Sequence, residues 1–494
     1  MATPVQIVIF GASGDLTAKK LVPALAGLAR KGEPPEGFEL VGVARRHLSD
    51  AEFRQELRAA QPPEGLADFD RMMPHIHYLS GDVRSLEDIR RLGTRLDALP
   101  GGAAAGRLYY LSLMPDLFGP AVSGLAQAGL LETSGPWRRV VLEKPFGRDF
   151  DSARALNQAL QGRLREEQIY RIDHYLGKET VQNLFAFRFN NTIFEPIWNR
   201  RHVELVQITV AESGGVEPGR AGYYDRAGAM SDVLQNHMLQ ILAMVAMEPP
   251  SSLDPEEVRG QKVSVLKSLR FRNSAGQSVR ARYGRGEVGG KPVAGYLDEG
   301  VPADSGTETF VAIRAEIENW RWSGVPFLLR HGKRLKQRFT EVKVQFRVPP
   351  IQLADHIMGG EPPILPDGTV CTLRPNVLTL SIQPRESLSL SFSVKSPGAG
   401  MVMVPAHLDF DYRDRFGEST TPAYERLLLD AILGDPTLFL RADEVEAAWR
   451  FTDAVRASWS GPGAPPLLEY APGGWGPEAA DGLFQGCEGG WSRG

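Results

Sequence analysis

VQIVIFGASGDLT, residues 5–17, is a strand-like run that leads directly into a turn with glycine at positions 11 and 14. Glycines in such a turn let the backbone approach a pyrophosphate, and the N–H groups that open the following helix attract its negative charge. The spacing is G-x-x-G rather than the full G-x-G-x-x-G, so a tight turn that binds no ligand is the alternative. The residues predicted to contact a dinucleotide are Gly11, Ser13, Gly14, Asp15 and Leu16.

Strand and helix signals alternate through the first third of the chain. The predicted strands are residues 6–10, 39–44, 76–79, 108–113 and 140–143, and helical patterns cover residues 17–30 and 86–97. This alternation is typical of a doubly wound parallel sheet. We therefore predict an α/β, Rossmann-like dinucleotide-binding domain over residues 1–175.

The second predicted strand ends in Arg45-Arg46 instead of the acidic residue that usually accepts from the ribose of NAD. An arginine fork binds a 2′-phosphate through two hydrogen bonds, whereas a carboxylate would repel it. NADP is therefore the predicted cofactor, and two solvated arginines are the alternative. Asp82 and Val83, after the third strand, are expected beside the adenine.

The remainder of the chain has longer alternating runs, at residues 203–210, 309–316, 343–348, 378–383 and 387–394. Such alternation predicts an antiparallel sheet with one solvated face, on which we expect helices at residues 230–247 and 424–433 to pack. The tail from Ser460 is rich in glycine and proline, so an irregular path is expected. We predict a larger α+β domain with a mainly antiparallel sheet over residues 176–494.

The composition limits the class of protein. The chain has 494 residues, a net charge of -4 and 42% hydrophobic residues, which fits a globular protein of at least two domains and argues against nucleic-acid binding. Two cysteines, Cys371 and Cys487, cannot build a disulfide framework and have no metal-binding spacing. No signal peptide and no apolar run of about 18 residues is found. We expect a cytoplasmic protein with no metal site and no membrane partner.

Two polar segments carry candidate chemistry. Residues 143–147 read EKPFG, and Lys144 would stand at the carboxyl end of a parallel strand, where open sheets bind ligands. Residues 171–179 read RIDHYLGKE, which places Asp173, His174, Tyr175 and Lys178 just before a helix. A dianionic phosphate accepts from N–H, imidazole, phenol and ammonium groups together. A loop that only caps the helix is the alternative.

His237 falls on the apolar stripe of the helix predicted at residues 230–247. A buried imidazole must find a partner, because an unpaired buried polar group is costly. From this helix alone, a histidine satisfied within the core is the usual interpretation.

Four segments together resemble the glucose-6-phosphate dehydrogenase family: residues 11–17, 143–147, 171–179 and 231–237, the last of which reads SDVLQNH. The similarity extends along nearly the whole chain. It implies an oxidoreductase that transfers a hydride from C1 of glucose 6-phosphate to NADP. The products would be 6-phosphogluconolactone and NADPH, in the first step of the oxidative pentose phosphate pathway, and the enzyme would be a homodimer or homotetramer.

The resemblance also implies a role for each site residue. His237 would take the proton of the C1 hydroxyl, and Asp173 would orient and stabilise its ring. Ser13 and Arg45 would bind the 2′-phosphate, and Lys144 would touch both sugar and cofactor. The other residues implied in substrate binding are His174, Tyr175 and Lys178 for the phosphate, and Glu212, Asp225, Lys333 and Arg338 for the rest of the sugar.

Two other functions compete with this one. A different Rossmann-type sugar oxidoreductase, acting on an unphosphorylated or nucleotide-linked sugar, would have no need of the donors at residues 174–178. A non-catalytic NADPH sensor would keep Gly11 and Arg45 but would have no reason to keep Asp173 and His237.

Overall fold

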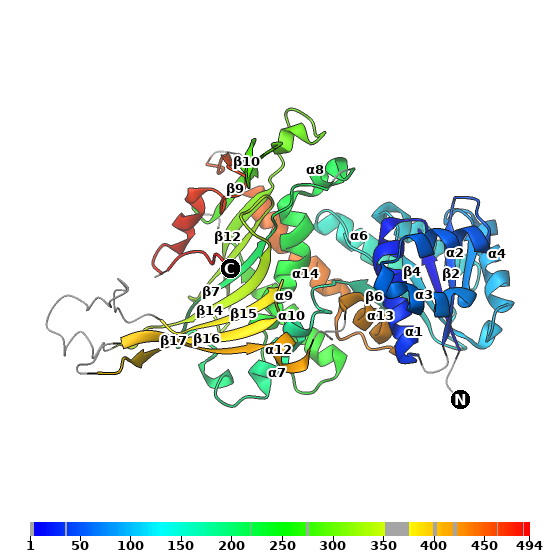
Figure 1. Ribbon diagram of the computed structural model, residues 1–494, viewed down its shortest axis with the longest axis horizontal. Coiled ribbons are helices and arrows are strands. Elements are labelled where there is room, and N and C mark those ends of the chain that lie inside the picture. Colours follow the sequence, from blue (N-terminus) through cyan, green and yellow to red (C-terminus); the bar gives the residue numbers. More distant parts are fainter. Residues whose placement is uncertain are drawn as a thin grey trace. The chain divides into compact units, whose positions relative to one another are not determined.

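The computed structural model describes residues 4–34, 37–217, 219–272, 276–350, 375–398, 403–417, 422–461, 463–487 and 489–494 (Figure 1). Cys371 lies outside these residues. The chain forms two compact units. The first comprises Met1–Lys178, Pro250–Val263 and Thr421–Arg450, and the second comprises Glu179–Pro249, Ser264–Thr420 and Phe451–Gly494. The first unit thus takes in two later segments that the sequence analysis assigned to the second domain.

A seven-stranded sheet forms the centre of the first unit, in the order β18-β6-β5-β4-β1-β2-β3. Its parallel strands are β1 (Val5–Phe10), β2 (Phe38–Ala44), β3 (Ile76–Ser80), β4 (Gly106–Leu111), β5 (Arg138–Leu142) and β6 (Ile169–Ile172). These strands are mostly buried, as expected where helices cover both faces. The predicted Rossmann-like sheet is confirmed. Strand β6 was not among the predicted strands, and neither was β18 (Phe439–Leu440), which adds an antiparallel edge beside β6.

Helices connect these strands. They are η1 (Thr17–Leu21), α1 (Val22–Lys31), α2 (Asp50–Ala59), α3 (Leu66–Met72), α4 (Leu86–Asp97), α5 (Phe118–Gln127) and α6 (Phe150–Gln161). The expected helix at 17–30 is divided, because η1 is a π-helix and α1 an α-helix. Ser49 and Glu52 form a capping box that fixes the start of α2.

The helix expected at residues 424–433 forms as α13 (Ala423–Leu433), but its predicted place on the antiparallel sheet is wrong. It belongs to the first unit and packs against α1. Gly27 of α1 leaves room for the carboxylate of Glu425, which is buried and pairs with Lys31. A charged side chain needs its partner when it leaves water, so this pair fixes α13 on α1. Two further helices, α10 (Pro255–Ser268) and α14 (Ala442–Ala457), begin in the first unit and end in the second.

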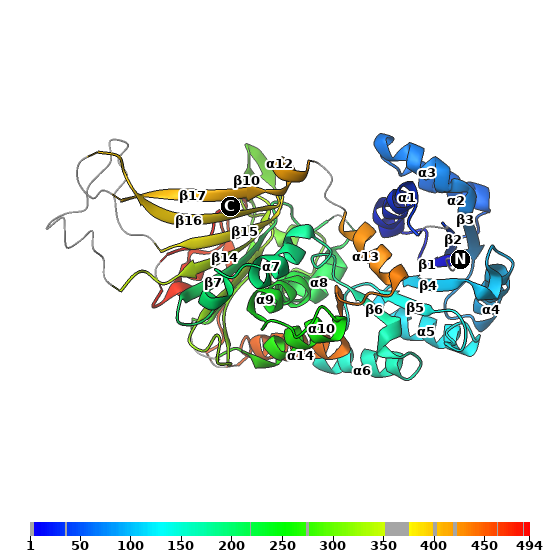
Figure 2. The ribbon, with the colours of Figure 1, turned by 90° about the horizontal axis from the view of Figure 1, so that it is seen from below.

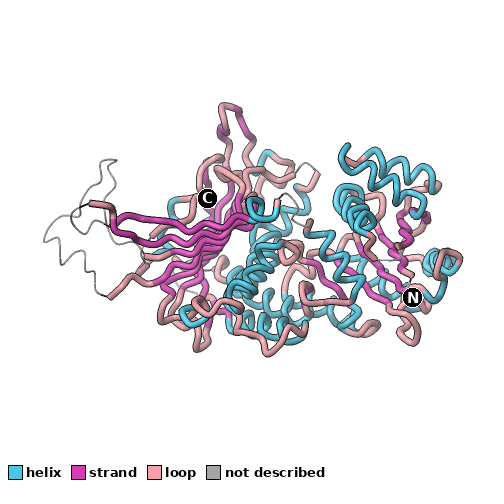
Figure 3. Tube along the Cα trace, turned by 60° about the horizontal axis from the view of Figure 1, so that its bottom comes forward, coloured by secondary structure: helices cyan, strands magenta, loops and turns pink. Residues whose placement is uncertain are grey.

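A large sheet forms the second unit, in the order β17-β16-β15-β14-β7-β13-β12-β9-β19, with β8 paired to β12 (Figure 3). All its pairs are antiparallel except β7–β13 and β9–β19, so the predicted mainly antiparallel sheet is confirmed. Its strands are β7 (Val203–Ala211), β8 (Leu269–Arg270), β9 (Ser278–Tyr283), β12 (Phe310–Ile317), β13 (Pro326–Gly332), β14 (Phe339–Phe346), β15 (Val377–Gln383), β16 (Ser387–Lys395), β17 (Met403–Asp411) and β19 (Leu467–Tyr470). A separate hairpin joins β10 (Gly286–Val288) to β11 (Lys291–Val293).

Helices cover one part of this sheet, as Figure 2 shows for α7 (Glu179–Phe189), α8 (Ala221–Ala229) and α9 (Leu239–Ala246) near β7 and β14. The helix predicted at residues 230–247 is present, but its first half, η8 (Met230–Met238), is a π-helix. Residues of η8 contact β7 and β13. A short helix, α12 (Tyr412–Phe416), follows β17. No helix within the described ranges is long and apolar enough to cross a membrane.

The tail is more regular than its composition suggested. It supplies β19 and a 3-10 helix, η10 (Glu478–Phe484), and its aromatic side chains enter the core. Trp491 is 8% exposed, packs edge-on against Phe484, and lies over the guanidinium of Arg330 at 4.8 Å. Burial of these aromatic side chains outweighs the tendency of glycine and proline to leave a segment irregular.

We predict that Trp491→Ala lowers the free energy of unfolding by about 3–5 kcal/mol, the usual cost of removing a buried tryptophan. Trp320→Ala is the matched control, because Trp320 is 90% exposed, and a change within about 0.5 kcal/mol is expected there. Chemical unfolding followed by circular dichroism measures both variants. Equal losses of stability would contradict the tail's role in the core.

Candidate functional site

The turn after β1 is built around Gly11. Its φ is +79°, and a Cβ at this position would overlap the carbonyl oxygen of Ser112. The Gly11 N–H donates to the carbonyl of Val43 (2.9 Å), and the Gly14 N–H donates to the carbonyl of Gly11 (3.0 Å). Only glycine fits here, so the backbone of the turn comes close to both neighbouring strands.

A hollow of about 870 Å³ opens beside this turn in the first unit. Most of the predicted cofactor residues line it, whereas Asp15, Leu16 and Lys144 are not among the lining residues. The Asp15 carboxylate instead pairs with Lys19 at 3.0 Å. The predicted residues that line the hollow are Gly11, Ser13, Gly14, Arg45, Asp82 and Val83.

The two arginines after β2 differ in their partners. Arg46 donates two hydrogen bonds to the carboxylate of Glu56, at 2.9 and 2.7 Å, and this bonding raises the pKa of Arg46. Both arginines are exposed and line the hollow, but only Arg46 is held by Glu56 in this way. Asp82 accepts from Arg84 at 3.0 and 3.2 Å, which lowers the pKa of Asp82. Arg45 is therefore the better placed of the two arginines for an anion in the hollow.

Lys144 lies in the turn after β5, and its peptide bond to Pro145 is cis. The preceding residue, Glu143, is buried, and burial raises the pKa of its carboxyl. The Glu143 carboxylate accepts hydrogen bonds from the hydroxyl groups of Tyr110 and Tyr424, the latter at 3.2 Å. The main-chain N–H of Lys144 also donates to this carboxylate.

The segment from Asp173 to Lys178 forms a tight turn after β6. Asp173 is 2% exposed, and its Oδ1 accepts from the main-chain N–H of Tyr175 at 2.9 Å. The ammonium of Lys178 lies 4.6 Å from the centre of the Tyr175 ring, and the rings of His174 and Tyr175 are 4.9 Å apart. The structure thus brings together the three donors predicted for a phosphate, His174, Tyr175 and Lys178.

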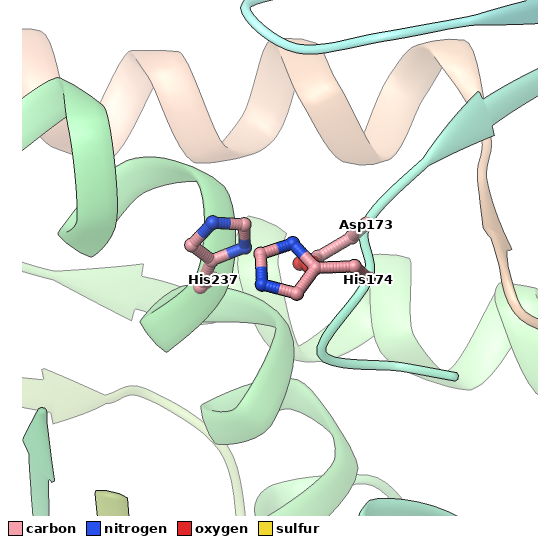
Figure 4. A group of neighbouring side chains, drawn as sticks. All are labelled: Asp173, His174 and His237. Atoms are coloured by element: carbon pink, nitrogen blue, oxygen red, sulfur yellow. The ribbon is translucent and has the colours of Figure 1, made fainter. Parts of the chain in front are cut away.

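His237 lies on η8 in the second unit and is 3% exposed. Figure 4 draws its ring together with the side chains of Asp173 and His174, which come from the turn after β6. Asp232 is the one residue of η8 that is not buried. His237 is thus one of the buried residues of η8, as its place on the apolar stripe indicated.

Glu212 and Lys333 form an ion pair in the second unit, with 2.6 Å between the carboxylate and the ammonium. Burial tends to raise the pKa of Glu212, but the charge of Lys333 and the ring of His331 outweigh it, so the pKa lies below its usual value. Burial lowers the pKa of the adjacent His331 to about 4. Near neutral pH, Glu212 is thus ionised and His331 is neutral.

The other two predicted substrate residues of the second unit, Asp225 and Arg338, are not part of this ion pair. The Asp225 carboxylate accepts from the hydroxyl groups of Tyr296 (2.8 Å) and Ser305 (2.5 Å), so side chains of the protein already engage it. Arg338 is exposed, just before β14. Asp232, whose charge acts on Glu212, was not among the predicted site residues. It is the single acidic residue of η8, and this is the signal that could have pointed to it.

The chain was compared with known protein families. Residues 8–183 match the family model "Glucose-6-phosphate dehydrogenase, NAD binding domain", and residues 185–492 match "Glucose-6-phosphate dehydrogenase, C-terminal domain". This chain belongs to the glucose-6-phosphate dehydrogenase family. The resemblance found in the sequence is confirmed.

Relatives and solved structures agree with this membership. The glucose-6-phosphate 1-dehydrogenase of Aggregatibacter actinomycetemcomitans is 44% identical, over 97% of this chain and 95% of that protein. The protein of the same name from Mycolicibacterium smegmatis is 43% identical, over 92% and 91%. A solved glucose-6-phosphate dehydrogenase in complex with glucose 6-phosphate has a TM-score of 0.87 and 35% identity, with both chains fully covered. The Mycobacterium avium enzyme has a TM-score of 0.81 and 36% identity, over 100% of this chain and 99% of that one.

The family uses NADP, and the hollow in the first unit fits this cofactor. The turn at Gly11 and Gly14 has no side chain that would block a pyrophosphate, and Arg45 offers a guanidinium at its rim. Ser13 lines the same hollow and can add a hydroxyl donor. These residues of the first unit would hold NADP.

We predict that Arg45→Ala raises the Michaelis constant for NADP about ten- to a hundredfold, the worth of one charge-assisted hydrogen bond, and leaves weak NAD use almost unchanged. Arg46→Ala is the matched control, because Glu56 already holds that guanidinium. Steady-state kinetics with each cofactor measure the effect. Equal losses with NADP and NAD would show that Arg45 does not bind the 2′-phosphate.

Proposed function

We propose that this chain oxidises C1 of glucose 6-phosphate and yields 6-phosphogluconolactone and NADPH. Membership of one enzyme family over both halves of the chain carries the proposal. The turn from Asp173 to Lys178 supports a phosphorylated substrate, because it gathers imidazole, phenol and ammonium groups within one tight turn. NADP, when bound, accepts the hydride that leaves C1.

His237 is the general base in this proposal. A neutral imidazole has a pKa matched to proton transfer near pH 7, and it takes the proton of the C1 hydroxyl as the C–H bond breaks. Asp173 orients the ring of His237 and stabilises its protonated form, as the family resemblance implies. The burial of Asp173 supports this role, because a carboxylate poorly screened by water acts more strongly on a cation.

The other predicted residues bind the sugar. His174, Tyr175 and Lys178 hold the phosphate, and Lys144 contacts both sugar and cofactor. In the second unit, Glu212 is an ionised acceptor for a sugar hydroxyl, and Lys333 holds its carboxylate in place. Hydroxyl binding by Asp225 stays a prediction, because Tyr296 and Ser305 engage its carboxylate. Asp232 is a second candidate for that role, and the exposed Arg338 remains a candidate for sugar binding.

We also infer a homo-oligomer, dimer or tetramer, whose copies pair through the large sheet. Strand β17 is at the edge of this sheet and exposes Leu408 (61%) and Phe410 (37%), and α12 exposes Phe416. Apolar side chains gathered at an edge strand are typical of an interface. Sedimentation equilibrium of the purified chain measures the number of copies.

Two cysteines in 494 residues fit a reducing cytoplasm.

The competing functions differ from this one in what they require. Another sugar oxidoreductase would reduce NADP equally well with a sugar that has no phosphate. A sensor would bind NADPH without turnover. NADP reduction measured with glucose 6-phosphate and with plain glucose separates the three functions, and we expect the phosphorylated sugar to be strongly preferred.

We predict that Lys178→Ala raises the Michaelis constant for glucose 6-phosphate about tenfold or more, because one charged hydrogen bond to the phosphate is lost. Turnover of plain glucose should change little, since that sugar has no phosphate to bind. Lys19→Ala, at an exposed ion pair, serves as the control. If both sugars are affected alike, Lys178 has a structural role and the phosphate binds elsewhere.

We predict that His237→Asn lowers turnover by about 10²–10⁴, the usual worth of a positioned general base, with little change in substrate affinity. Asparagine can still accept or donate a hydrogen bond, but it cannot take the proton. In the wild type the rate should rise with pH as the imidazole loses its proton, because only the neutral imidazole is a base. The variant should lose this dependence.

Asp173→Asn provides the companion test. Its turnover should also fall, and the double variant should be far less damaged than the product of the two single losses, because the two residues act as a unit. Near-normal turnover in His237→Asn would return His237 to a structural role.

A further inference from the structure

Tyr424 contacts one predicted substrate-binding residue, His174, and the residue that precedes another, Lys144. It lies near the start of α13, and its hydroxyl donates to the Glu143 carboxylate at 3.2 Å. Its ring stacks on the imidazole of His174, with ring centres 6.2 Å apart and planes only 5° from parallel. All three residues belong to the first unit.

The hydroxyl group of Tyr424 acts on Lys144 through the preceding residue, Glu143. Glu143 is buried, and its carboxylate accepts from Tyr110, Tyr424 and the main-chain N–H of Lys144. A buried carboxylate is held firmly where several donors converge on it, because each lost bond leaves charge unsatisfied. The Tyr110 and Tyr424 hydroxyls therefore fix the turn that presents the ammonium of Lys144.

The stack of Tyr424 on His174 acts on the turn from Asp173 to Lys178. A nearly parallel aromatic partner restricts the rotation of an imidazole, and such a stack is worth about 0.5–1.5 kcal/mol beyond its buried area. His174 otherwise belongs to a turn whose order comes from the bonds of Asp173 and Tyr175. The Tyr424 ring thus constrains the plane of the His174 imidazole.

We propose that Tyr424 is a positioning residue for the sugar-phosphate site, aligning Lys144 through Glu143 and His174 through direct stacking. Tyr424 itself need not touch the substrate. This inference rests on the proposed function, since it assumes that Lys144 contacts the sugar and His174 the phosphate.

The two contacts can be removed separately. Tyr424→Phe keeps the stack on His174 and loses only the bond to Glu143, so turnover should fall roughly two- to tenfold with little change in the Michaelis constant. Tyr110→Phe is the matched control, because Tyr110 also donates to Glu143 and has no ring contact with His174 among the described interactions. It should reproduce the effect of Tyr424→Phe.

Tyr424→Leu removes both contacts. It should add a rise of roughly three- to tenfold in the Michaelis constant for glucose 6-phosphate, and no such rise for plain glucose, because His174 serves the phosphate. In a His174→Ala background, Tyr424→Leu should produce no further rise in that constant. A variant that only loosened the fold would affect both sugars alike.

Steady-state kinetics of the full-length enzyme with both sugars measure these effects, and thermal melts establish that each variant is folded. If Tyr424→Leu does not fold, the comparison of Tyr424→Phe with Tyr110→Phe still tests the Glu143 contact. Wild-type kinetics for either single Phe variant, or additive losses for Tyr424→Leu and His174→Ala, would overturn the inference. A wild-type enzyme that fails to oxidise glucose 6-phosphate would instead overturn the proposed function.

Discussion

Parallel pairing of neighbouring strands is the constraint on which the first unit depends. Because β1, β4, β5 and β6 run in the same direction, the turns that follow them leave the sheet at one edge. The backbone of Gly11 can approach Ser112 so closely only because β1 and β4 end together. The same register places the turn with Lys144 beside the turn that begins at Asp173. The turns that carry the residues proposed to bind cofactor and phosphate are thus gathered by hydrogen bonding between strands.

Much of this arrangement could be predicted from the sequence, because its signals are local. Apolar runs that end in glycine or in charged residues predicted five of the six parallel strands, all but β6, and the turns with Gly11, Arg45 and Lys144. Long-range contacts left no comparable signal. Strand β18 has two residues and exists only through its pairing with β6. The placement of α13 depends on a buried ion pair between residues far apart in the sequence, Lys31 and Glu425.

In the second unit too, local features could be predicted from the sequence, whereas contacts between distant residues could not. The apolar stripe identified the helix that carries His237, yet periodicity could not distinguish a π-helix from an α-helix. Family similarity pointed to Asp225, whereas the contacts of Tyr296 and Ser305 with its carboxylate appear only in three dimensions. Burial of Trp491 and Phe484 likewise requires the whole sheet, so a tail rich in glycine and proline could not be predicted to enter the core.

The return of a late segment to the first unit has a consequence for biosynthesis. The first stretch of this unit ends at Lys178, but β18 and α13 belong to the stretch Thr421–Arg450. Translation proceeds at roughly 5–20 residues per second, so the nascent dinucleotide fold waits on the order of ten to fifty seconds for its last strand and helix. During that interval the outer edge of β6 has no strand beside it, and the surface of α1 that α13 later covers faces water or a chaperone.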